Sequence, residues 1–177
     1  MSTPERPPGD TGPGQTGPRD PRSLVPPRAF DSVLSTVVDN NPDMTPEMAT
    51  RITCEGIKFV VAGAEFPAAA MAPSRVVDEG WHALIVHTQL YADLCAQHGG
   101  FVHHSPGYDP TFYDPAILDR TEDTIRAAGF EVDTDLWGSP TDELVRVAAN
   151  CQHAPTCAIR PMPTPQPPYD KHSTAAA

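Results

Sequence analysis

The segment of this chain that is most informative about its architecture is residues 73–100, which read PSRVVDEGWHALIVHTQLYADLCAQHGG. Its apolar residues recur every three or four positions, which is the spacing of one face of an α-helix. Ser74 is suited to cap the helix at its start, and the two glycines at 99–100 stop it. The pattern predicts a helix over residues 75–97. Its buried face comprises Val77, Trp81, Leu84, Ile85, Thr88, Tyr91, Leu94 and Cys95.

Two helical patterns precede this segment. The first covers residues 29–38 and ends at an Asn-Asn-Pro sequence. The second follows Thr45, a suitable N-cap before Pro46 at the first helical position, and continues to about Phe66. Gly56 lies on this second helix among other small residues, so we expect that another helix can approach it closely.

Two more helical patterns follow the segment. One covers residues 115–128 and is closed by Gly129, and the other covers residues 141–150 with Ser139 as its cap. No stretch alternates apolar and polar residues for long enough to predict a strand. Five helices without sustained heptads indicate an all-α fold, a small irregular orthogonal bundle rather than a coiled coil.

Proline is concentrated at the two ends, with 8 of the 22 prolines in residues 1–27 and 6 in residues 154–177. Segments rich in Pro and Gly with few apolar residues cannot offset the entropy of ordering. We therefore expect disordered tails at 1–27 and 154–177 around one helical domain at 28–153. No secretory signal or membrane span of about 20 apolar residues is recognisable, so we expect a cytoplasmic protein that does not enter membranes.

The chain is acidic, with a formal net charge of -11. An acidic surface repels phosphate backbones and anionic lipids, which argues against nucleic-acid and membrane partners and favours metal cations or basic protein partners. The four cysteines, Cys54, Cys95, Cys151 and Cys157, are too few and too scattered for a disulfide framework, so we expect free thiols.

Asp78 and His82 are the residues of the long helix best placed for chemistry. They are four positions apart, so they share a face and can point at one atom. His87 does not share this face. It lies five residues after His82, which places it about 140° away from His82 around the helix axis. His103 and His104 follow the helix end, where an extended pair points in opposite directions, so one of the two can face His82.

Two imidazoles and one carboxylate are a ligand set used by zinc and by non-haem iron when positions stay open for water or substrate. Asp78, His82, His103 and His104 are therefore candidate metal ligands or catalytic residues. The first hypothesis is a metal-binding domain, or a metal-dependent enzyme that acts on a small-molecule substrate. The alternative is a non-catalytic protein-interaction module in which the same cluster is a structural hydrogen-bond network. Metal-free acid/base catalysis by the His pair is a third hypothesis.

Two further segments carry residues of interest. Cys151, His153 and Cys157 supply three zinc-type ligands without an obvious fourth, so the alternative is a pair of unpaired thiols beside a chance His. Residues 105–115 carry Tyr108 and Tyr113 close to the His pair. This segment is either a lid over a site or a connection rich in turns.

A longer pattern runs through the same region. VDEGWHALI at residues 77–85, followed by Thr88, Tyr91 and Cys95 and by FVHHSP at 101–106, resembles the bacterial relatives of the glycine-rich domain-containing protein family. These relatives show V-D-x-x-W-H-x-x-I-x-x-T-x-x-Y-x-x-[FL]-C followed by F-[IV]-H-H-x-P.

The resemblance implies that Asp78, Trp81, His82 and the pair at 103–104 form one constellation, and it implies no particular reaction. Plant members of the family show W-H-x-H, whereas Leu84 occupies the position of the second His in this chain.

Overall fold

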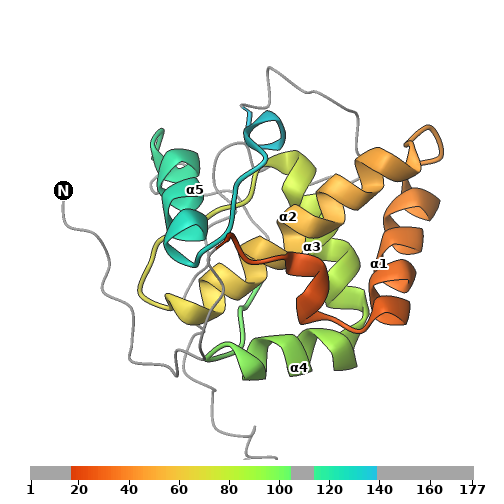
Figure 1. The fold of residues 1–177 in the computed structure, drawn as a ribbon. Helices are drawn as coiled ribbons and strands as arrows, with labels where there is room; N and C mark the ends of the chain where they lie inside the picture. The colour runs from red at the N-terminus through yellow and green to blue at the C-terminus, as the bar shows by residue number, and fades with distance from the viewer. Residues whose placement is uncertain (1–16, 105–113, 139–177) are drawn as a thin grey trace, which may run out of the picture.

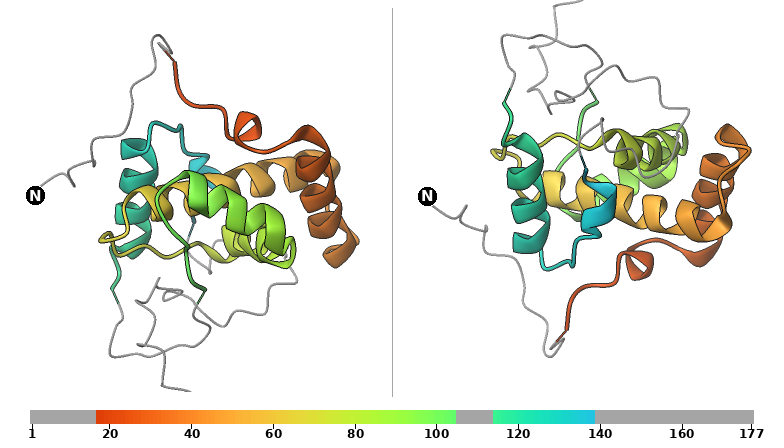
Figure 2. Two further views of the ribbon diagram at one scale, coloured as in Figure 1. Left: turned by 90° about the horizontal axis from the view of Figure 1, so that it is seen from below. Right: turned by 90° about the horizontal axis from the view of Figure 1, so that it is seen from above.

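A computed structural model of the chain describes residues 17–104 and 114–138, and these residues form five α-helices without a β-strand (Figure 1). The central helix is α2 (Pro46–Glu65), which contacts each of the other four helices. α1 (Pro27–Asn40) lies beside the N-terminal half of α2, and α5 (Ile117–Ala127) lies beside its C-terminal half (Figure 2). The predicted all-α class is confirmed. No helix in the described part of the chain is long and apolar enough to cross a bilayer.

The predicted helix starts are confirmed at two caps. The Thr45 hydroxyl accepts a hydrogen bond from the amide of Met48 at 3.2 Å, and the Ser74 hydroxyl accepts one from the amide of Val77 at 3.1 Å. Each cap satisfies one of the amide groups that a helix start leaves without a partner inside the helix. These two caps place the start of α2 and the start of α3.

The prediction of one long helix over residues 75–97 is wrong in one respect, because this segment forms two helices. α3 (Arg75–Val86) and α4 (Thr88–Gln97) are separated by His87, whose amide donates to the carbonyl of Leu84 at 3.1 Å and not one residue further back. β-branched residues surround this position, and they lower helix propensity. The apolar spacing did not indicate the break because both helices continue the same three-to-four period.

α2 and α3 cross at two glycines. A methyl group at Gly80 would lie 2.4 Å from the carbonyl oxygen of Ile52, and one at Gly56 would lie 2.8 Å from the carbonyl carbon of Gly80. Both distances are far below van der Waals contact, so the two backbones touch. The close approach predicted at Gly56 is confirmed, and it places the Asp78–His82 turn of α3 directly against the central helix.

The N-terminal boundary differs from the expectation, because residues 17–27 pack on the domain. They include the short helix η1 (Pro21–Leu24), and Val25 is buried. The Arg19 guanidinium donates to Glu65 at 2.8 Å and to the carbonyl of Ala128 at 2.7 Å. These hydrogen bonds and the burial of Val25 order a segment whose proline content predicted disorder.

Three predictions lie outside the described residues: the character of residues 1–16, the helix at 141–150 with its cap at Ser139, and the tail at 154–177.

Candidate metal centre

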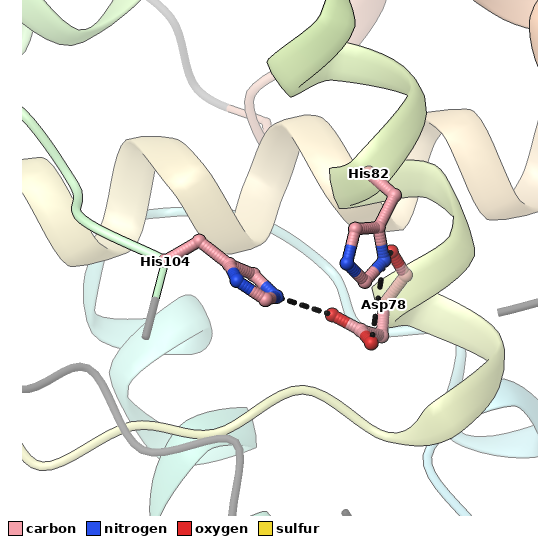
Figure 3. A group of neighbouring side chains, drawn as sticks. All are labelled: Asp78, His82 and His104. Atoms are coloured by element: carbon pink, nitrogen blue, oxygen red, sulfur yellow. Dashed lines mark hydrogen bonds and ion pairs between the residues drawn. The ribbon is translucent and has the colours of Figure 1, made fainter. Parts of the chain in front are cut away.

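Asp78, His82 and His104 come together in one group that could hold a metal ion (Figure 3). α3 supplies the first two, one turn apart, and His104 comes from the segment that follows α4. Each residue offers a ligand atom, and these atoms all lie within 4.8 Å of one another. The sequence left open which histidine of the 103–104 pair faces His82, and the structure brings His104 to it.

The distances within the group are too long for hydrogen bonds between the side chains. His82 Nδ1 lies 3.4 Å from one carboxylate oxygen of Asp78, and His104 Nε2 lies 3.6 Å from the other. The closest polar contact joins His82 Nδ1 to the backbone carbonyl oxygen of Asp78 at 2.9 Å. Because a carbonyl only accepts, this contact places the imidazole proton on Nδ1 and orients the ring above Asp78.

The carboxylate of Asp78 is the unusual feature of the group. Asp78 is 1% exposed, and neither carboxylate oxygen has a hydrogen-bond partner among the described residues; His104 Nε2 also lacks one. A buried polar group without a partner costs about 1–3 kcal/mol, and a buried charge costs more. The carboxylate oxygens of Asp78 and Nε2 of His104 are therefore buried polar atoms that face one another without a hydrogen bond.

Two other buried carboxylates show how this protein treats such groups elsewhere. Glu55 accepts from the ammonium of Lys58 at 2.5 Å and from the indole of Trp137 at 2.8 Å. Glu79, the neighbour of Asp78, accepts from the amide of Asn41 at 3.0 Å. Both carboxylates have donors within the fold. Asp78 is the exception among these three, because its side-chain neighbours are the imidazoles of His82 and His104 at 3.4 and 3.6 Å, which form ion pairs with it only when they are protonated.

Trp81 and Tyr91 hold the segment that carries His104. Trp81 is buried, as predicted for a core residue, and its ring centroid lies 4.6 Å from that of His104. Its indole N–H donates to the hydroxyl of Tyr91 at 3.0 Å, and that hydroxyl donates to the carbonyl of Val102. Burial raises the pKa of Tyr91, so the hydroxyl keeps its proton and stays a donor. The chain of bonds fixes the backbone two residues before His104.

This positioning role of Tyr91 was missed at the sequence level, where Tyr91 was interpreted as core alone. It is indeed buried. In one continuous helix, however, Trp81 and Tyr91 would be about 15 Å apart along the axis. The break at His87 brings their polar atoms together, and no pattern in the sequence indicated that break.

His103 and His87 lie outside the group, and His87 was expected to do so. The ring of His103 packs on Phe101, with centroids 4.8 Å apart, and His87 Nε2 lies 3.0 Å from the hydroxyl of Thr36 on α1. Cys54 and Cys95 are free thiols, as predicted. The residues Tyr108, Tyr113, Cys151, His153 and Cys157 lie outside the described part of the chain.

The spacing of the group suits a single ion. Zinc binds imidazole nitrogen and carboxylate oxygen at about 2.0–2.2 Å, so two ligand atoms at a tetrahedral angle lie about 3.4 Å apart. The 3.6 Å between Asp78 and His104 is close to that value. The same distance leaves too long a gap for a direct hydrogen bond.

Residues 26–109 match a protein-family model described as UCP032817-like. The match covers less than half of the chain and includes α1 to α4 and all three residues of the group. No curated protein and no solved structure matches the chain. The resemblance to the glycine-rich domain-containing protein family stays a prediction.

Proposed function

We propose that this protein binds a divalent transition-metal ion, zinc or iron, through Asp78, His82 and His104. The observation that carries the proposal is the buried Asp78 carboxylate, which has no hydrogen-bond partner among the described residues. A cation between Asp78 and His104 would satisfy both carboxylate charge and imidazole lone pair at once. The attraction between the ion and the carboxylate would offset the free-energy cost of burying Asp78.

The type of metal follows from the ligand chemistry. Two imidazoles with one carboxylate suit zinc, iron and their neighbours in the first transition row, whereas magnesium and calcium prefer oxygen ligands throughout. The contact between His82 Nδ1 and a backbone carbonyl is typical of metal-bound histidines, whose second ring nitrogen is held by a carbonyl or carboxylate. In that arrangement Nε2 of His82 is the ligand atom. In Figure 3 it lies on the side of the ring that faces His104.

Three protein ligands leave coordination positions open. Structural zinc sites normally have four protein ligands, whereas catalytic zinc and non-haem iron sites keep a position for water or substrate. The group therefore favours a reactive or exchangeable metal over a purely structural one. The alternative function, an interaction module pinned by a hydrogen-bond network, gains no support from distances of 3.4 and 3.6 Å.

Metal content tests the proposal directly. The chain is purified without chelator and analysed for bound elements. It is then stripped and titrated with zinc(II) and, anaerobically, with iron(II). We expect one ion per chain in the wild type. Affinity in Asp78→Asn, His82→Ala and His104→Gln should fall at least about 100-fold, since removal even of an outer partner costs 10- to 100-fold.

His103→Gln is the matched control, because it removes an adjacent imidazole that lies outside the group. It should keep wild-type affinity, and circular dichroism should show that all four variants retain the helical fold. Absence of saturable binding in the wild type, or unchanged binding in Asp78→Asn, would rule out this metal site.

A further inference from the structure

The three residues carry one negative charge between them. Two neutral imidazoles and one carboxylate leave a bound divalent ion with a net charge of +1. The neighbouring buried carboxylates are not ligands that lower this charge, because Glu55 accepts from Lys58 and Trp137, Glu79 accepts from Asn41, and neither belongs to the group. A net charge in a largely buried place is costly unless a counter-charge approaches it.

One side of the group is accessible to solvent. Asp78, His82 and Val86 follow one another at four-residue spacing, so they lie on one face of α3. Their exposure increases along that face: the side chains of Asp78 and His82 are 2% and 34% exposed, and Val86 is 66% exposed. Trp81 is buried and the side chain of His104 is only 13% exposed, so the Val86 side is the more exposed side of the group among the described residues.

We propose that the metal-loaded site completes its coordination with a small carboxylate-type anion taken from solvent on the Val86 side. This inference rests on the metal binding proposed above. A monoanion brings the centre to neutrality, which a water molecule does only after it has lost a proton. The negative charge of the whole chain does not prevent this, because charges more than about 8 Å away are largely screened at physiological ionic strength.

Cobalt(II) in the full chain makes the test independent of any reaction. Its visible bands respond to a change of ligand, so the cobalt-loaded chain is titrated with sodium acetate at constant ionic strength set by sodium perchlorate. We expect a saturable spectral change with acetate and none with perchlorate alone. Bands that ignore acetate would overturn the inference while leaving the metal site intact. A chain that binds no cobalt would overturn the metal site, and this inference with it.

The direction of approach is tested by two substitutions at an exposed residue. Val86→Asp and Val86→Lys place opposite charges at the accessible end of the face, one helical turn beyond His82. At a distance on the order of 10 Å, a unit charge changes the affinity for a monoanion about two-fold in a water-like dielectric. These titrations are run at an ionic strength of about 0.01 M, where the Debye length is about 30 Å and the charge is not screened. Val86→Asp should weaken acetate binding and tighten cobalt binding, and Val86→Lys should do the reverse. A general loss of stability cannot move the two affinities in opposite directions. Equal acetate affinities in the two variants would contradict approach from this side.

Discussion

Replacement of Asp78 by Asn should stabilise the metal-free protein. The Asp78 carboxylate is buried without a hydrogen-bond donor among the described residues, and the effective desolvation cost of such a charge is several kcal/mol. An amide of the same shape is neutral, and its NH2 group can donate to Nε2 of His104. Some cost of an imperfectly bonded amide remains, so we expect a net gain of about 1–3 kcal/mol. At about 4 °C per kcal/mol for a domain of this size, Tm rises by about 4–12 °C.

The assay is thermal and urea denaturation after removal of metal, at pH 8, where imidazole is ordinarily neutral. Zinc should narrow or reverse this difference, because a ligand at 100 times the wild-type Kd adds about 2.7 kcal/mol to the wild type and no more than about 0.4 kcal/mol to Asp78→Asn, whose Kd is at least about 100-fold higher. Glu55→Gln is the matched control. It makes the same change in a carboxylate that accepts from Lys58 and Trp137, so it should destabilise the protein. A metal-free Asp78→Asn chain less stable than wild type would refute the reasoning.

Three further predictions concern the α2–α3 crossing, the segment that carries His104 and the Arg51–Asp133 ion pair. Gly80→Ala should destabilise the protein by about 2 kcal/mol in urea denaturation, because its methyl group would lie 2.4 Å from the carbonyl oxygen of Ile52. Gly100→Ala is the control and should be neutral, because its methyl group would meet nothing within 4 Å. Tyr91→Phe leaves the indole of Trp81 and the carbonyl of Val102 without their partner, so zinc affinity should fall and Tm should drop by several degrees; an unchanged zinc affinity would show that Tyr91 does not position His104. The hydrogen bonds of Arg51 lower the pKa of Asp133, so the stability that this carboxylate contributes is present above about pH 3.8 and is lost as pH falls further; Asp133→Asn should flatten this acid limb in denaturation between pH 5 and 2.5.

Local chemistry explains which parts of the fold could be predicted from the sequence. The starts at Thr45 and Ser74 were predictable because a hydroxyl cap acts on amides only two or three residues away. The break at His87 was not predictable from the apolar spacing, because the same period continues through it and the low helix propensity of its β-branched neighbours is too small an effect to predict a break. The order of residues 17–27 was missed because it depends on contacts with distant parts of the chain, namely the burial of Val25 and the bonds of Arg19 to Glu65 and Ala128, which local composition does not show.

The same division holds within the candidate site. Asp78 and His82 could be paired from sequence because four residues on a helix fix their geometry. The choice between His103 and His104 depends on the direction in which a loop leaves α4, and composition carries no information about that direction. The unsatisfied state of Asp78 was likewise invisible, because Asp78 and Glu79 look alike in sequence and differ only in the donors that the fold brings to them.

The site is therefore built from two parts of unequal rigidity. Asp78 and His82 belong to a helix whose backbone touches α2, so their positions are set by the core. His104 belongs to the segment after α4, which is held by the hydrogen bond from the Tyr91 hydroxyl to the carbonyl of Val102. An ion that binds all three adds a bond between the helix and this segment, so metal binding and ordering of the segment must be coupled. The coupling is reciprocal: any change that loosens the segment lowers metal affinity, even when every ligand is intact.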